Sequence, residues 1–261
     1  MNRISSQPSI VALGDRRRPE PPALVLVAHG SRDPRTLNTV HELLDRLRDR
    51  RPDLPVHLGH IELNAPLLPD TLASLGTAEA VLVPLLLSRG YHVKRDIPDM
   101  AAASPARTRV AAPLGPHPLL VETLHARLVE AGWHTDEETR RESAVVLAAA
   151  GSRDPESALD TRRTAKLLAD RLGVPVVPAY ASAATPTVDT AIRALTARGR
   201  HRIAIASYFT APGLFARQCA ERAPWIASAP LGTHPAMTDL ILHRYDQVAR
   251  AAGHPLPALA V

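Results

Sequence analysis

The chain has little cysteine, few aromatic residues and no long apolar run. Cys219 is the single cysteine among 261 residues, which excludes an internal disulfide, a zinc site of paired cysteines and a cysteine-ligated iron–sulfur cluster. Aromatic residues make up 3% of the chain, too few for the stacking platforms of nucleic-acid-binding proteins. No apolar run approaches the roughly 20 residues of a membrane-spanning helix. We therefore expect a cytoplasmic protein that binds neither a membrane nor nucleic acid.

The composition that remains is that of a globular protein with basic charge. Hydrophobic residues make up 45% of the chain and charged residues 22%, with a formal net charge of +5, and such proportions are typical of soluble domains. The basic charge is almost all arginine, scattered along predicted helices rather than gathered in a stripe, so it equally suits a small polyanionic ligand. Neither GxxxxGK[ST] nor GxGxxG occurs, so we expect no nucleotide.

The most informative feature is an internal repeat. The phrase VLVAHGSRDPR at 25–35 returns as VLAAAGSRDPE at 146–156, offset by 121 positions. Two further pairs agree: NAPLLPDTLASL with ATPTVDTAIRAL, and APLGPHPLL with APLGTHPAM. The repeat predicts one fold written twice in a single chain.

Short apolar runs alternate with helix-length segments through both halves. The runs predict strands at 23–28, 55–63, 80–86, 108–111, 144–149, 174–179, 202–207 and 226–227. The segments between them predict helices at 36–50, 67–75, 98–103, 118–131, 157–172, 187–198, 214–222 and 235–252. Buried strands alternating with helices are typical of parallel sheets. We expect an α/β fold of two similar lobes, each a four-stranded parallel sheet flanked by helices, with the active cleft between the lobes.

The same reading divides the chain into five parts. They are a disordered leader at 1–22, an N-terminal lobe carrying the site at 23–132, a charged linker at 133–143, a C-terminal repeat lobe at 144–252 and a tail at 253–261.

The repeat helps to distinguish structural residues from functional ones, because we expect residues present in both copies to serve the fold. Gly30 permits a tight turn after the first strand, and Asp33 before Pro34 predicts a helix N-cap. His117 and His234 both occur in LG-x-HP, so we assign both to the scaffold.

Three polar residues occur in one copy alone, each at or just past the carboxyl end of a predicted strand: His29 (opposite Ala150), Glu62 (opposite Ser182) and His92 (opposite Phe215). Carboxyl ends of parallel strands meet at one edge, and two imidazoles with a carboxylate suit a first-row transition metal. A histidine at a strand end is more often structural, and a glutamate there can simply face water. His60 is an alternative to Glu62, because it lies on the same strand face.

VAHGSRDPR, an ELNAP segment, VPLLLSRGYHVKRDIP and LGPHPLL together resemble the sirohydrochlorin chelatases. The resemblance covers about residues 23–250, in the two-lobed long form of this ATP-independent class. It implies a lyase-class enzyme that inserts Fe²⁺ or Co²⁺ into sirohydrochlorin, serving sirohaem or cobalamin biosynthesis. It also implies that His29 and His92 are the metal-site pair and that Glu62 assists. The histidine-rich and cysteine-containing tails of some members are absent.

The implied chemistry needs groups for the metal, for two departing pyrrole protons and for the substrate's carboxylates. Histidine, with an ordinary pKa near ~6.5, can bind a metal or accept a proton, and which histidine does which stays open. Sites of this kind also accept Ni²⁺ or Zn²⁺. The residues expected to contact substrate are Ser31, Arg32, Arg35, Leu86, Ser88, Arg89, Gly90, Tyr91, Lys94 and Arg95. The alternative for each arginine is a solvated surface charge. Leu85–Leu87, Phe209 and Phe215 are expected to form apolar walls.

Two other functions compete with this interpretation. A histidine phosphatase would have an arginine before the histidine, where this chain has Ala28. A non-catalytic carrier of metal or tetrapyrrole could use the same residues. One chain holds both lobes, so a monomer would suffice, although a dimer is compatible with the sequence.

Overall fold

The computed structural model describes residues 21–251 and residue 253. The predicted leader therefore lies outside the described residues except for Pro21 and Pro22, and so does the predicted tail except for Gly253. Within the described part, no helix is both long and apolar enough to cross a membrane.

Each half of the chain forms a four-stranded parallel sheet, as the repeat predicts. The first contains β1 (Ala23–Ala28), β2 (Val56–His60), β3 (Glu79–Pro84) and β4 (Arg107–Val110), in the order β2-β1-β3-β4. The second contains β5 (Ser143–Ala149), β6 (Val176–Tyr180), β7 (Arg202–Tyr208) and β8 (Ile226–Ala227), in the matching order β6-β5-β7-β8. The central strands β1 and β5 are buried throughout, which explains why their sequences are continuously apolar.

Helices connect the strands and cover both faces of each sheet. They are α1 (Pro34–Arg50), α2 (Leu68–Ser74), η1 (His92–Asp96), α3 (Ile97–Ala102), α4 (Pro118–Glu130), α5 (Glu137–Arg140), α6 (Pro155–Leu172), α7 (Val188–Thr196), α8 (Leu214–Ala220) and α9 (Pro235–Ala251). The repeated phrase caps a helix in both halves. The Asp33 side chain accepts from the backbone N–H of Arg35 at 3.0 Å, and Asp154 accepts from that of Glu156 at 2.9 Å. The predicted N-cap is therefore confirmed, since each cap satisfies an otherwise unpaired helix-end donor.

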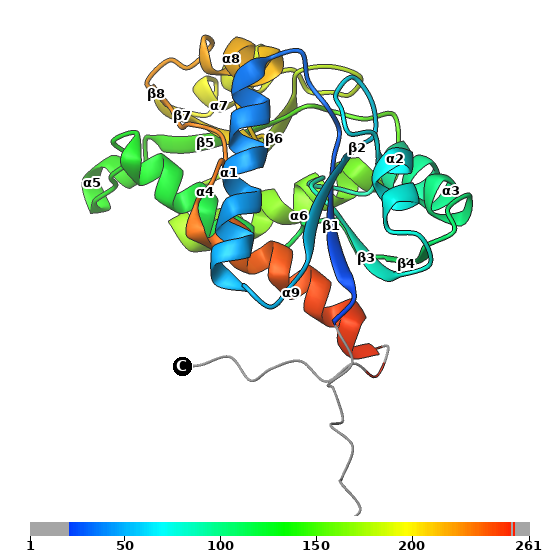
Figure 1. The fold of residues 1–261 in the computed structure, drawn as a ribbon. Helices are drawn as coiled ribbons and strands as arrows, with labels where there is room; N and C mark the ends of the chain where they lie inside the picture. The colour runs from blue at the N-terminus through cyan, green and yellow to red at the C-terminus, as the bar shows by residue number, and fades with distance from the viewer. Residues whose placement is uncertain (1–20, 252, 254–261) are drawn as a thin grey trace, which may run out of the picture.

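The two lobes share one hydrophobic core. Alternate residues of β1 face opposite ways: Val25 and Val27 pack outward with α2 and α3, whereas Leu24 and Leu26 belong to the shared core. Apolar residues of β5, α1, α4, α6 and α9 join that same core. Figure 1 shows these helices between the two sheets, with α2 and α3 outside one sheet and α7 and α8 outside the other.

The last helix of each half packs on the other half's sheet. Helix α9, from the end of the chain, contacts β3 and α1 of the first lobe. Helix α4, from the end of the first half, contacts β7 and α6 of the second. The lobes are thus tied together by exchanged helices as well as by their interface.

The structure departs from the predicted elements near the site. Strand β2 ends at His60 rather than at residue 63, because Leu63 turns the chain with a φ of 66°. Helical structure after β3 begins at His92, as the π-helical turn η1, rather than at Pro98. The segment predicted as a linker contains α5 and the first residue of β5.

Candidate functional site

The turn after β1 brings His29 and Glu62 together. Gly30 has a φ of +105°, and a Cβ there would lie 2.0 Å from the carbonyl oxygen of Glu62, so only glycine permits this close approach. The backbone N–H of Glu62 donates to the carbonyl of His29 at 3.1 Å. The side chains follow this pairing, with His29 Nδ1 3.5 Å from Glu62 Oε1 and both side chains about half exposed.

The π-helical turn orients His92. Its Nδ1 lies 2.6 Å from Oδ2 of Asp96, four residues along η1. Sequence reasoning missed Asp96, because the helix was predicted to begin only at Pro98. The signal was nevertheless present, since His and Asp four residues apart share one face of a helix.

The two imidazoles meet edge to face, with ring centroids 4.6 Å apart and an interplanar angle of 87°. The three residues singled out by the repeat therefore lie at one edge of the first sheet. Among the described residues, however, no three His, Cys, Asp or Glu side chains are grouped closely enough to hold a metal ion as a set. The protein thus offers a pair of facing imidazoles with carboxylates beside them, rather than a closed ligand cage.

Two adjoining cavities, of about 420 Å³ and about 690 Å³, run between the lobes. Both are lined by His29 and by apolar residues from each lobe: Leu85, Leu86, Ala150, Phe209 and Phe215. Their size lies in the ordinary range for small-molecule sites. The cleft between lobes that the repeat predicts is therefore present, with His29 at the junction of its two parts.

The second lobe has the same turn as the first, at Gly151, but lacks the histidine and the glutamate beside it. Gly151 has a φ of +95°, and a Cβ there would lie 1.9 Å from the carbonyl oxygen of Ser182. The N–H of Ser182 donates to the carbonyl of Ala150 at 2.9 Å, as Glu62 does to His29 in the first lobe. Both glycines allow the same close approach of two chain segments. Only in the first lobe do these segments carry side chains that can bind metal, His29 and Glu62.

The structure divides the residues expected to contact substrate. Those that line the cavities are Ser31, Arg32, Leu86, Ser88, Gly90 and Tyr91, whereas Arg35, Arg89, Lys94 and Arg95 do not line either one. Arg35 is ion-paired with Asp33 at 2.7 Å. Arg32 and Arg95 are exposed and form no ion pair with any described residue.

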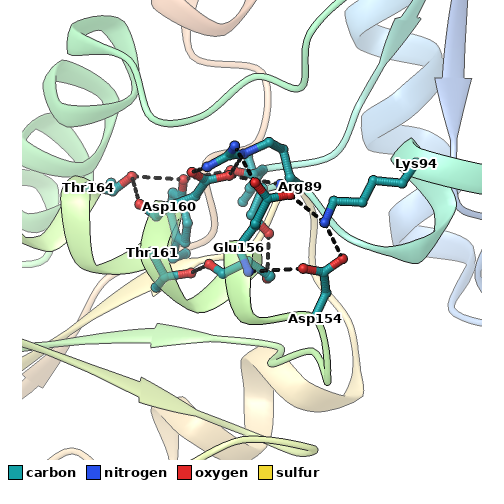
Figure 2. Close-up of polar contacts among 11 residues, drawn as sticks. Arg89, Lys94, Asp154, Glu156, Asp160, Thr161 and Thr164 are labelled. Atoms are coloured by element: carbon teal, nitrogen blue, oxygen red, sulfur yellow. Dashed lines mark hydrogen bonds and ion pairs between the residues drawn. The ribbon is translucent and has the colours of Figure 1, made fainter.

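Arg89 and Lys94 correct the expectation that they are free to hold substrate carboxylates. Figure 2 shows both reaching into the second lobe, where Arg89 pairs with Asp160 and Glu156 at 2.7 and 2.9 Å. Lys94 pairs with Glu156 and with Asp154, the latter at 2.7 Å. Carboxylates of the second lobe therefore already neutralise both charges, and neither side chain lines the two cavities.

The remaining histidines singled out by sequence have structural contacts. His60 is 1% exposed and is among the residues that line the larger cavity, and its Nδ1 is 3.2 Å from the carbonyl oxygen of Pro66. His117 Nδ1 accepts from the N–H of Leu119, and His234 Nδ1 from that of Ala236, each at 3.2 Å. Both rings therefore cap the start of a helix, which fits their assignment to the scaffold.

Comparison with known proteins adds independent findings. A model of the CbiX family matches residues 23–131 and 144–248. A sirohydrochlorin cobaltochelatase from Methanococcus maripaludis is 38% identical over 79 residues, which cover 29% of this chain and 55% of that protein's length. A sirohydrochlorin ferrochelatase from Priestia megaterium is 22% identical over 250 residues, 89% of this chain and 92% of that protein. SirB from Bacillus subtilis with Fe³⁺ has a TM-score of 0.72 and 23% identity, covering 89% of this chain and 97% of that one, which shows a shared fold.

Proposed function

Since the chain belongs to the sirohydrochlorin chelatase family that the CbiX model describes, we propose that it inserts Fe²⁺ or Co²⁺ into sirohydrochlorin without ATP. The observation that carries this proposal is the pair of imidazoles, His29 and His92, whose ring centroids lie 4.6 Å apart on the first lobe's side of the interlobe cleft.

The Asp96 carboxylate orients the His92 ring for binding a metal ion. An ionised carboxylate only accepts hydrogen bonds, so the proton of the neutral His92 ring lies on Nδ1, which faces Asp96 at 2.6 Å. Its Nε2 then carries the lone pair. Such a carboxylate–histidine arrangement fixes the tautomer and raises the basicity of the ligand nitrogen. His29 and Glu62 form a looser version at 3.5 Å, longer than a normal hydrogen bond.

An incomplete ligand set suits a metal that is substrate rather than resident cofactor. Two imidazoles leave coordination positions open, and pyrrole nitrogens can take those positions while the ion is still held. A closed set of four protein ligands would retain the metal instead. The facing pair is therefore compatible with transfer of the ion.

Metal insertion must also remove two pyrrole protons. A neutral imidazole that is not bound to the ion can accept them one at a time at neutral pH. The half-exposed Glu62 carboxylate lies 3.5 Å from His29 Nδ1, where it can stabilise the imidazolium and pass each proton in turn to solvent. We assign His29, Glu62 and His92 to these steps together, with Asp96 as the orienting group for His92.

The cleft matches a flat apolar macrocycle with an acidic rim. Leu85, Leu86, Phe209 and Phe215 supply apolar walls from both lobes. Arg32 lies at the wall of the larger cavity without an ion pair to any described residue, so we propose it as a partner for a substrate carboxylate.

The direct test is anaerobic incubation of the protein with sirohydrochlorin and either Co²⁺ or Fe²⁺, followed by absorption spectroscopy. We expect metallation at least ten times faster than in a protein-free control. Tight binding of metal or tetrapyrrole with metallation no faster than the control would contradict the proposal and identify a carrier instead.

A further inference from the structure

The segment that carries His92 is held by the second lobe at several consecutive positions. The hydroxyl of Tyr208 donates to the carbonyl of Leu87 at 3.0 Å. The hydroxyls of Ser88 and Ser157 are 2.8 Å apart. Arg89 follows immediately, and its ion pairs reach the same helix, α6. His92 is three residues further along, so the chain that leads to it is fixed to the second lobe at Leu87, Ser88 and Arg89.

Asp160 is the centre of these contacts. Its side chain is 1% exposed, and it accepts from the backbone N–H of Arg89 at 3.0 Å and from the guanidinium at 2.9 and 2.7 Å. Burial alone would raise the pKa of Asp160, but the hydrogen bonds from Arg89 outweigh burial and hold that pKa below its ordinary value. A buried carboxylate with three such bonds from one residue fixes the main chain of Arg89 as well as its side chain.

The repeat shows that this arrangement exists on one side of the cleft alone. The equivalent loop of the second lobe places Pro212 where the first has Arg89, and Pro212 contacts α1 through one hydrogen bond, from the Thr36 hydroxyl at 2.7 Å. On α1, Thr39 stands where α6 has Asp160. No ion pair joins that loop to α1 in the described part of the chain. The charged contacts therefore accompany the loop that carries a histidine and are missing from the loop that carries Phe215.

We propose that the second lobe positions His92, with Asp160 acting through Arg89 as the positioning residue for the metal-site pair. Glu156 and Asp154 extend the same contact by binding Lys94, two residues past His92 (Figure 2). The lobe that lacks metal-binding side chains thus controls how well the other lobe binds metal. This inference rests on the proposed function for its biological meaning. The position of His92 and the Co²⁺ affinity can nevertheless be measured without tetrapyrrole.

The test compares Asp160→Asn with a matched control, Asp246→Asn. Asp246 on α9 pairs with the buried Arg51 at 3.4 Å, far along the chain from either histidine. Both variants remove one carboxylate charge that binds an arginine of the other lobe, with a side-chain exposure of 1% for Asp160 and 14% for Asp246. We expect Asp160→Asn to weaken Co²⁺ binding about tenfold, the low end for groups that orient a metal ligand. The Co²⁺ affinity of Asp246→Asn should stay within about twofold of that of the parent protein.

Two readouts separate positioning from loss of stability. In ¹H–¹⁵N spectra of the imidazole rings, Asp160→Asn should shift or broaden the His92 signals and leave those of His117 unchanged. Amide hydrogen exchange of residues 89–94 should become faster. Asp246→Asn should do neither, even if both variants lower the melting temperature equally.

A milder variant covers the case in which Asp160→Asn does not fold. Glu156→Gln removes a half-exposed partner of Arg89 and Lys94, and we expect it to weaken Co²⁺ binding by no more than about fivefold, with the same change in the His92 signals. Unchanged His92 signals and an unchanged Co²⁺ affinity in the folded variants would overturn the inference. Absence of chelatase turnover would contradict the proposed function alone.

Discussion

The two lobes have one backbone plan and two different cleft surfaces. His29 and Ala150 follow equivalent central strands, and each precedes a glycine that allows the same close chain crossing. In the first lobe that crossing brings a carboxylate beside an imidazole, whereas in the second it brings Ser182 beside Ala150. Since the second lobe keeps the same backbone without them, the fold does not require His29, Glu62 or His92. Their presence in one copy is therefore evidence for chemistry.

Substituting residues of the second lobe into the first lobe tests this difference most directly. We expect His29→Ala and His92→Phe each to lower chelatase activity at least 100-fold, because the loss of one imidazole removes both a metal ligand and a proton acceptor. Circular dichroism and the melting temperature should stay close to those of the parent protein, since the second lobe accepts these side chains at equivalent positions. Activity within tenfold of the parent would contradict the assignment.

The next largest effect should come from Asp96, which has Cys219 as its counterpart on α8. Asp96→Asn removes the carboxylate charge that faces His92 Nδ1 at 2.6 Å, so we expect a 10- to 100-fold fall in Co²⁺ affinity and in kcat/KM, about the range for such partners. Isothermal titration calorimetry and steady-state rates measure the two quantities. The exposed Asp99, three residues further on, provides the control, and Asp99→Asn should change neither.

The shared turn can be tested in both lobes at once. Gly30→Ala and Gly151→Ala should each lower the free energy of unfolding by at least about 2 kcal/mol, because both residues have a positive φ and a Cβ would overlap a carbonyl oxygen. Gly132 has the same φ as Gly151, +95°, with open space around it, so Gly132→Ala should cost only about 1 kcal/mol. Urea denaturation measures all three.

The turn variants also differ in what they do to activity. Folded Gly30→Ala protein should lose chelatase activity, because the clash displaces Glu62. Folded Gly151→Ala protein should keep most of it. Equal losses of activity in both would show that the crossing matters only for the fold.

The smallest expected effect concerns a residue common to both lobes. Burial, and then the nearby charges of Arg244 and His243, lower the pKa of His117 from 6.5 to about 4. The unfolded chain therefore binds a proton that the folded chain rejects, and stability should fall as the pH drops from about 6.5 towards 4. His117→Ala should remove part of that fall. Melting temperatures between pH 7 and pH 4 measure it.

At pH 7, His117→Ala should cost about 1 kcal/mol of stability through the lost hydrogen bond to Leu119, and it should leave turnover nearly unchanged. A larger effect on turnover than on stability would mean that His117 is not a scaffold residue.

Most elements of the fold could be predicted from the sequence, because buried strands and N-caps are local patterns. The repeat in turn singled out three residues that lie close together in the structure. The meeting of His29 with Glu62 follows from parallel topology, whereas the order of the strands within each sheet was not predicted. The start of η1 at His92 was not predicted, because Pro98 marked the expected first turn of the helix and the structure places that proline at the start of α3, after η1. Asp96 was missed for the same reason.

The direction of long charged side chains was also beyond the sequence. Arg89 and Lys94 lie beside His92 along the chain, so a role in binding substrate carboxylates was the natural expectation. Their partners lie on α6 and at its N-cap, Asp154, at least 60 residues away in the chain. The repeat shows which residues of the two halves are equivalent, but it does not show which surfaces of the two halves pack together.

The exchange of α4 and α9 has a consequence for any attempt to divide this protein. A cut between residues 133 and 143 would give two fragments, each containing the helix that covers the other's sheet. Alone, each fragment would expose an apolar face and aggregate. Mixed together, the fragments should reassemble, which makes the chain a candidate for split-protein complementation.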